Sequence, residues 1–391
     1  MQTSKNYLFN YLANELRPMF KRQYLREDIG AAIAVAFVAI PLSLAVALAT
    51  GVAPQVALIS AVIGGILGAV FGGSRLGITG PAVAMSVLLA GVLQDFGFAG
   101  LLIVGLICGL LQISLGILKL GRIAKYIPLS LVLAFTAGIG FLLFFEQLPY
   151  AFQIAGQTNN TITQTYSNLH LYAHHVSSAG FGLAALTIAI LTIVPRFLPR
   201  AYAFFFAVLI PMTLAHVTNI SVATVGMLPH DIFHPTVIDF NLINDWPKLA
   251  LTGLEVFILA SLETLLSLSA VDLMGKGDLH NPSQELIGQG VANIGVALFG
   301  GIPVSGIVAR SSVNVLAGAK TRRAAIFHAL IILIVVYCVP QVIEMMPVAV
   351  LSGILIAAAF KMMNIRQVVD LWKSDRWDVF SLFYYFFCHY W

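Results

Sequence analysis

Two charged residues and one hydroxyl residue lie inside apolar stretches, where they could bind ions. Glu263 is halfway along the apolar run 249–271, and Ser267 follows four residues later on the same face of the expected helix. Arg310 lies near the start of the apolar segment 306–319. A charge at the centre of a bilayer costs about 2.5–3.5 kcal/mol or more unless it is compensated. We therefore expect each charge to have a partner.

The pair Glu263 and Arg310 has two interpretations. Arg310 falls in the first turn of an expected helix, where the helix dipole disfavours a positive charge, so a negative group should offset it. If Glu263 is that negative group, the two residues form a structural ion pair. A substrate anion would leave Glu263 and Ser267 to carry a coupling cation, a proton or sodium. Oxygen ligands and a nearby arginine favour sodium, whereas desolvation of the carboxyl group favours a proton.

The composition predicts a polytopic membrane protein. Of the 391 residues, 59% are apolar and only 10% are charged, and the mean hydropathy is +0.92. A soluble domain carries about 25% charged residues, so a soluble enzyme is excluded, and so is a disordered chain. A net charge of +4 spread over apolar stretches is no basic patch, which argues against a nucleic-acid partner. No nucleophile, metal or phosphate-loop motif supports an enzyme.

The apolar runs have the length that a membrane span needs, about 17–25 residues, or slightly less. They are 29–50, 54–71, 99–118, 127–148, 179–195, 201–218, 249–271, 286–300, 324–339 and 347–360. Segments 80–94 and 306–319 are apolar but too short and too rich in small residues for full spans. Another run starts near Asp378. The cysteines Cys108, Cys338 and Cys388 lie in apolar stretches and are interpreted as packing residues.

The basic residues predict an orientation. With a cytoplasmic N-terminus and alternating spans, every Lys and Arg falls on the cytoplasmic side except Arg75, Lys248 and Arg310. This predicts an integral protein of a bacterial inner membrane. The loops 149–178 and 219–247 are then extracytoplasmic. Their histidines are interpreted as solvated rather than as metal ligands, since no cysteine accompanies them.

Two segments far apart repeat one pattern. Phe71–Gly91 and Phe299–Gly318 both begin with Phe-Gly-Gly, continue through a short irregular link to [Ser/Thr]-Gly, and end in a small-residue helix. An odd number of crossings separates them, so the second copy enters from the opposite side, as in an inverted repeat. Two half-helices that face each other would make an anion site, because their N-termini carry partial positive charge. The alternative is a pair of glycine-rich packing helices.

Three stretches resemble the SulP family, the sulfate-permease-type anion transporters. They are Leu25–Val52, Phe71–Pro81 and above all Leu262–Arg323, which contains "QELIGQGVANI" and "FGGIP…AR". The resemblance implies an all-α fold of two inverted seven-segment repeats, with a core and a gate domain. In it, half-helices three and ten meet at mid-membrane.

The resemblance also implies a site and a transport class. The family's substrate site falls on Gly80, Pro81, Ala82, Val83, Gly306, Ile307 and Val308, to which Arg310 is added, and the cation site falls on Glu263 and Ser267. The implied function is secondary transport of an inorganic anion such as sulfate or bicarbonate by alternating access. No cofactor is expected other than a coupling sodium ion, and full-length members are expected to form homodimers.

The chain departs from the family pattern in two places. Many proton-coupled bacterial members have Glu after the proline of the first segment, but here Leu42 follows Pro41, which favours sodium. Family members normally continue through segment fourteen into a cytoplasmic STAS domain, and the chain is expected to be truncated before it. The predicted organisation is a cytoplasmic segment 1–27, a first repeat 28–218, an extracytoplasmic loop 219–247 and an incomplete second repeat 248–391.

Several alternatives remain open at this point. They are a proton-coupled dicarboxylate carrier, a nucleobase permease of the same architecture, a channel, and a product that does not transport. Nucleobase sites usually offer carboxylates to a neutral ring, whereas Arg310 favours an anion.

Overall fold

The computed structural model describes residues 22–121, 129–154, 177–229, 235–240, 243, 245–274 and 279–363. Nearly all of its elements are helices, which confirms the predicted all-α class. In chain order they are η2 (Arg22–Tyr24), α2 (Leu25–Thr50), α3 (Pro54–Phe71), β1 (Thr79–Gly80), α4 (Val83–Ile117), α5 (Leu129–Phe152), α8 (Ser178–Ile193), η4 (Val194–Arg196), α9 (Arg200–Val217), α10 (Trp246–Met274), α11 (Pro282–Leu298), β2 (Ser305–Gly306), α12 (Val308–Leu316), α13 (Arg323–Cys338), α14 (Pro340–Glu344) and α15 (Val348–Met363).

Six of the described helices are long and apolar enough to cross a membrane: α2, α3, α4, α8, α9 and α10, where α2 is counted with η2 and α8 with η4. The helices α13 and α15 are apolar but shorter. The two separately predicted runs 80–94 and 99–118 lie, except for residues 80–82 and 118, in the single element α4, which has a kink at Gly97 (φ 64°, ψ −167°). Glycine tolerates this left-handed φ because it lacks a Cβ atom.

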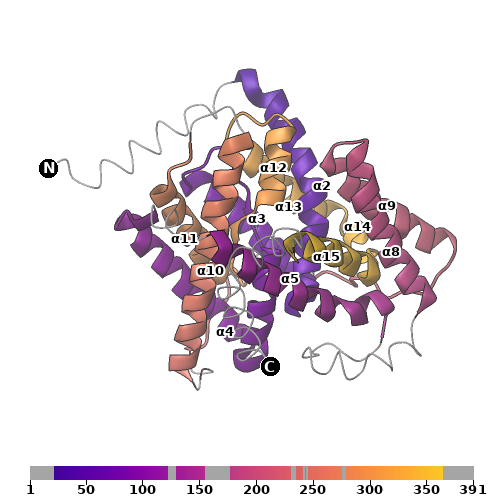
Figure 1. The fold of residues 1–391 in the computed structure, drawn as a ribbon, viewed down its shortest axis with the longest axis horizontal. Helices are drawn as coiled ribbons and strands as arrows, with labels where there is room; N and C mark the ends of the chain where they lie inside the picture. Colours follow the sequence, from indigo (N-terminus) through magenta and orange to yellow (C-terminus); the bar gives the residue numbers. More distant parts are fainter. Residues whose placement is uncertain are drawn as a thin grey trace. The chain divides into compact units, whose positions relative to one another are not determined.

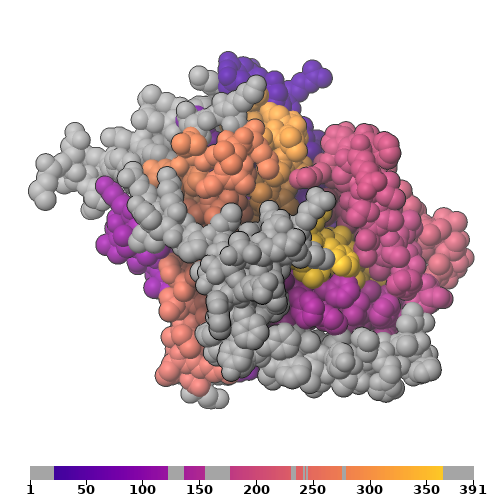
Figure 2. All heavy atoms as spheres, viewed as in Figure 1, coloured from indigo at the N-terminus to yellow at the C-terminus, as the bar shows by residue number. Residues whose placement is uncertain are grey.

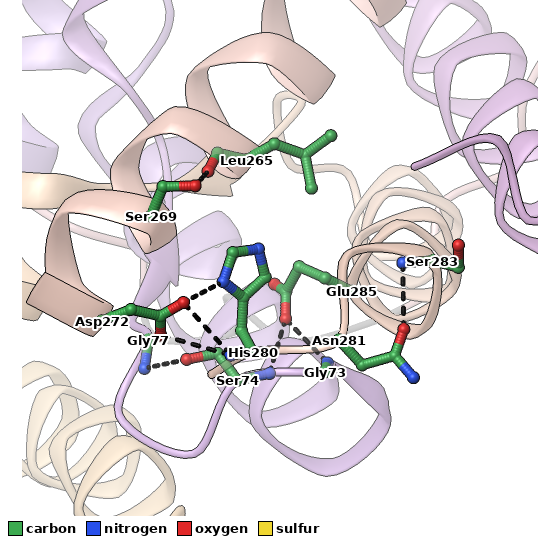
Figure 3. Close-up of polar contacts among 10 residues, drawn as sticks. All are labelled: Gly73, Ser74, Gly77, Leu265, Ser269, Asp272, His280, Asn281, Ser283 and Glu285. Carbon is green, nitrogen blue, oxygen red and sulfur yellow. Dashed lines mark hydrogen bonds and ion pairs between the residues drawn. The ribbon is translucent and has the colours of Figure 1, made fainter. Parts of the chain in front are cut away.

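The helix ends follow local rules. Asn281 precedes α11, and its side-chain oxygen accepts hydrogen bonds from the N–H groups of Ser283 and Gln284, both at 3.2 Å. Pro282 then occupies the first helical position, where no N–H donor is needed. Just before this cap, His280 Nδ1 lies 2.6 Å from a carboxylate oxygen of Asp272, near the end of α10 (Figure 3). These contacts join the end of α10 to the start of α11.

The chain forms two compact units, each built from several stretches. Unit 1 comprises residues 1–43, 55–124 and 229–339, and unit 2 comprises 44–54, 125–228 and 340–391. Each unit therefore takes residues from both predicted repeats, while the repeat boundaries themselves stay a prediction.

In unit 1, α4 packs along α11 and α10, and α10 also contacts α12 and β2 (Figure 1). The backbones of α4 and α11 come very close: a Cβ atom added to Gly109 would lie 2.7 Å from the carbonyl oxygen of Gly290. Such small-residue contacts are how helices approach each other in a membrane, where apolar burial does not drive association.

In unit 2, α15 packs against α5 and α8, and α8 packs against α9. Figure 2 shows the yellow surface of α15 beside the magenta α5. A Cβ atom added to Gly353 of α15 would lie 2.9 Å from the carbonyl oxygen of Ala184 in α8. Unit 2 thus uses the same close helix contacts as unit 1.

The buried carboxylate of Asp28, in the first turn of α2, fastens that helix to the loop that follows α12. It accepts hydrogen bonds from the backbone N–H groups of Lys320 and Thr321, from the Thr321 hydroxyl at 2.7 Å, and from Arg323 Nη2 at 2.9 Å. Breaking a buried ion pair of this kind costs about 3–5 kcal/mol, because the remaining partner keeps an unpaired charge.

We predict that Asp28→Asn lowers the free energy of unfolding by about 3 kcal/mol, because the amide removes the buried negative charge that the Arg323 guanidinium contacts. Thermal unfolding of the detergent-solubilised chain measures this. Glu27→Gln is the matched control, since Glu27 is the exposed neighbouring carboxylate. Equal midpoints for the two variants would contradict the role of Asp28.

Candidate functional site

The two repeated segments meet inside unit 1. β1 and β2 pair antiparallel, with Thr79 opposite Gly306 and Gly80 opposite Ser305. The paired strands β1 and β2, with the irregular chain that leads into each of them, are called the crossing below. The meeting of the two broken segments, which the family resemblance implied, is therefore confirmed.

A helix begins shortly after each strand: α4 at Val83 and α12 at Val308. Neither Ala82 nor Ile307, which precede these helices, accepts a capping hydrogen bond with its side chain. The first N–H groups of both helices thus lack a side-chain cap, and helix N-termini of this kind attract anions.

Side chains of α11 hold the irregular chain between α3 and β1. Glu285 Oε2 accepts hydrogen bonds from the backbone N–H groups of Gly73 at 2.7 Å and Ser74 at 2.9 Å (Figure 3). One turn later, Gln289 Nε2 donates to Thr79 Oγ1 at 2.7 Å and to Glu285 Oε1 at 2.8 Å. The four-residue spacing in "QELIGQ" places both side chains on one face of α11.

Helix α12 also holds the irregular segment between α3 and β1. The backbone N–H of Ile78 donates to Ser311 Oγ at 2.9 Å, and its carbonyl oxygen accepts from the N–H of Ile307 at 3.0 Å. Asn314 Nδ2 donates to the carbonyl oxygen of Leu76 at 2.9 Å. Polar groups of α11 and α12 therefore hold the irregular segment before β1.

The segment before β2 is held in the same manner. The N–H of Ile302 donates to Ser60 Oγ of α3 at 2.8 Å. Asn293 of α11 bonds both backbone groups of Val304: its Oδ1 accepts from the N–H at 2.7 Å, and its Nδ2 donates to the carbonyl oxygen at 3.1 Å. Non-helical backbone at membrane depth needs such partners, because no lipid group can replace them.

Consecutive residues of α10 contact both residues of β2. The hydroxyl of Ser305 donates to Glu263 Oε2 at 2.9 Å, and the N–H of Gly306 donates to Thr264 Oγ1 at 2.8 Å. Ser267 is buried one turn further along α10. The predicted cation ligands thus lie on a helix that is bonded directly to the crossing.

Arg310, in the first turn of α12, is completely buried. Its Nη2 donates to Ser43 Oγ of α2 at 2.9 Å, and a Cβ atom added to Gly80 would collide with its Nη1. Within the described part of the chain, Nε and Nη1 have no hydrogen-bond partner, and Arg310 forms no ion pair with Glu263. The structural Glu263–Arg310 pair, one of the two interpretations of the sequence, does not form.

The predicted site residues divide by exposure. Most of them are buried at the crossing or directly after it: Gly80, Pro81, Ala82, Gly306, Ile307 and Arg310. Val83 is half-buried and Val308 is exposed at the helix starts. The histidines of the loops 149–178 and 219–247, which are His170, His174, His175, His230 and His234, lie outside the described residues. The described residues contain no group of three or more His, Cys, Asp or Glu side chains that could hold a metal ion.

Sequence reasoning missed Ser43, Thr264 and Ser305. Ser305 was visible only as the polar half of the [Ser/Thr]-Gly pair, and Thr264 only as the neighbour of Glu263. Nothing in the sequence marked Ser43, because its role depends on a contact between residues 267 positions apart.

Comparison with known families shows to which family the chain belongs. The model of the Sulfate permease family matches residues 25–385. The chain belongs to this family. Relatives include the putative sulfate transporter YvdB of Bacillus subtilis, which is 31% identical over 328 residues, covering 80% of this chain and 59% of YvdB. The bicarbonate transporter BicA of Picosynechococcus is 28% identical over 310 residues, covering 72% of this chain and 52% of BicA.

The family member described here thus spans between half and three fifths of the length of these relatives. Solved structures share its fold. The transmembrane domain of a cyanobacterial BicA superposes with a TM-score of 0.87 at 23% identity, covering 95% of this chain and 97% of that domain. SLC26A9 superposes with a TM-score of 0.85 at 15% identity, covering 100% of this chain and 67% of SLC26A9.

We predict that Asn293→Leu destabilises this family member strongly. The variant leaves the N–H and the carbonyl oxygen of Val304 without partners, at about 1–3 kcal/mol for each group. Ser269→Ala is the control, since among the described residues the Ser269 hydroxyl bonds only the carbonyl oxygen of Leu265 in its own helix (Figure 3). Thermal unfolding in detergent should separate the two variants, and equal stability would show that Asn293 does not support the crossing.

Proposed function

We propose that this integral membrane chain carries the substrate pathway of a secondary anion transporter, with an inorganic anion such as sulfate or bicarbonate as substrate. Its membership of the sulfate permease family and the names of its relatives support the class. The observation that carries the proposal is Arg310, a buried positive group that has no carboxylate partner among the described residues and lies against the crossing of two broken helices.

The proposed binding mode uses charge that is already in place. The N-termini of α4 and α12 each present about half an elementary positive charge through their unpaired N–H groups. Arg310 adds a full charge beside Gly80. An anion that sheds its water at the crossing would replace lost hydration with these fixed donors, whereas a neutral nucleobase would gain little from them.

Alternating access belongs to the same proposal. The contacts that shape the crossing come from α2, α3, α10, α11 and α12, and all of them lie within unit 1. Unit 1 would therefore carry the bound anion as one body, with the binding geometry kept intact during the movement. We also propose that the N-terminus lies in the cytoplasm of a bacterial cell, as the distribution of basic residues indicates.

We predict that Arg310→Ala weakens sulfate or bicarbonate binding at least about tenfold, because a hydrogen bond to a charged group contributes about 1.5–3 kcal/mol. Binding of each labelled anion to the purified chain measures this. Arg196→Ala, which removes an exposed arginine, is the control. Unchanged affinity in well-folded Arg310→Ala protein would exclude Arg310 from the anion site.

A sodium ion is the coupling cation that we propose at Glu263. The carboxylate of Glu263 lies beside the hydroxyl of Ser305, and the same stretch of α10 offers hydroxyls at Thr264 and Ser267. Hard cations such as sodium prefer oxygen ligands of this kind. Leu42 supplies no carboxylate in the first segment, so Glu263 is the better-placed acid for coupling.

We predict that Glu263→Gln abolishes the stimulation of uptake by sodium, because the amide is neutral and mimics a protonated acid. The assay is anion uptake into proteoliposomes, with sulfate, bicarbonate and fumarate each tested with and without sodium and a proton gradient. Glu255→Gln changes an exposed carboxylate of the same helix and should leave the sodium response intact. Sodium-independent uptake that an inward proton gradient drives would overturn the sodium assignment.

A further inference from the structure

The guanidinium group of Arg310 has an unusual set of partners for a buried charge. Its hydrogen bond to Ser43 Oγ is made to a neutral hydroxyl, although buried charges are normally paired with an opposite charge. Two buried carboxylates of the same unit are engaged elsewhere: Asp28 accepts from Arg323, and Glu285 accepts from backbone N–H groups. Ser43 is therefore the side chain to which the structure assigns the orientation of Arg310.

The hydroxyl of Ser43 is itself held by a hydrogen bond within α2. It donates its only hydrogen to the carbonyl oxygen of Ala39, one turn earlier in α2, at 2.7 Å. A hydroxyl has one donor and two acceptor lone pairs, so only acceptor capacity remains to face Arg310. The side chain is completely buried, which restricts its rotamer further. Ser43 thus presents a fixed acceptor rather than a mobile one.

The position of this acceptor decides where the rest of the guanidinium points. The group is planar and rigid, so anchoring Nη2 also fixes Nη1 and Nε. Nη1 is so close to Gly80 that a Cβ atom there would collide with it, and Gly80 pairs with Ser305 in the crossing. Nε and Nη1, which have no hydrogen-bond partner in the described part of the chain, are therefore held beside the backbone where the anion is proposed to bind.

We propose that Ser43 is the positioning residue for Arg310, and that its neutral hydroxyl keeps the positive charge of Arg310 available to an anion. The inference rests on the proposed anion site. A carboxylate at position 43 would orient the guanidinium equally well but would neutralise it. The hydroxyl therefore provides orientation without cancelling the charge that attracts the substrate.

Three variants of the full 391-residue chain test this inference, with labelled sulfate and labelled bicarbonate as probes. Ser43→Ala removes the acceptor and should weaken binding of the transported anion about tenfold. Ser43→Thr keeps the hydroxyl and should retain affinity close to the parent. Ser43→Asp should abolish binding, because it pairs with Arg310. Ser352→Ala is the matched control: Ser352 is also completely buried, and its hydroxyl bonds its own helix at Ala349.

A double variant separates positioning from general packing. In the Arg310→Ala background, Ser43→Ala should cause no further loss of affinity, since the group that Ser43 orients is gone. A purely structural serine would instead add its full effect in both backgrounds. Should Ser43→Ala fail to fold, Ser43→Cys preserves the volume with a much weaker acceptor and should show the same tenfold loss.

The outcomes distinguish this inference from the proposed function. If the parent binds either anion and Arg310→Ala loses binding while Ser43→Ala does not, Ser43 is not the positioning residue and the anion site stands. Additive losses in the double variant overturn the inference in the same way. If the folded parent binds neither probe, the proposed function fails, and this inference fails with it.

Discussion

Backbone groups that leave a helix inside a membrane must find hydrogen-bond partners within the protein, and this requirement organises unit 1. Two segments interrupt the helical pattern, one before α4 and one before α12. Lipid offers them no hydrogen-bond partner, and each group left unpaired inside the protein would cost several kcal/mol. The antiparallel pairing of β1 with β2 satisfies part of this need, and side chains of the neighbouring helices satisfy much of the rest.

The same requirement explains the polar residues of apolar helices. Ser60, Thr264, Asn293, Ser311 and Asn314 lie on four different helices, and each bonds a backbone group of an interrupted segment. In a soluble protein such residues would compete with helix formation by bonding nearby backbone. Here each of them bonds the backbone of another segment, and Ser60 does so while its hydroxyl also donates to Val56 of its own helix. They therefore help to determine which segments meet. The backbone of the crossing is consequently held in one geometry by the protein itself.

Three buried arginines of unit 1 have different kinds of hydrogen-bond partner. Arg323 is paired with Asp28 at 2.9 Å, and Arg322 Nη1 donates to the carbonyl oxygens of Ala69 and Gly72. Arg323 therefore neutralises a carboxylate, Arg322 supplies donors to carbonyl oxygens, and both hold helices together. Arg310 instead meets the hydroxyl of Ser43. Among the described residues its charge meets no counter-charge at the crossing, which supports the proposal that it binds an anion.

The sequence by itself determined the membrane class, the positions of the helices and the pair of repeated segments. Low charge, apolar run length and the Phe-Gly-Gly repeats are local properties that survive without knowledge of the fold, so the α3 range 54–71 was predicted to the residue. The tertiary structure alone decided the partners. Glu263 faces Ser305 rather than Arg310, and Arg310 faces Ser43, because hydrogen bonds between residues separated by 42 and 267 positions depend on how helices pack. Helical periodicity shows which face a residue occupies, but it carries no information about what lies opposite that face.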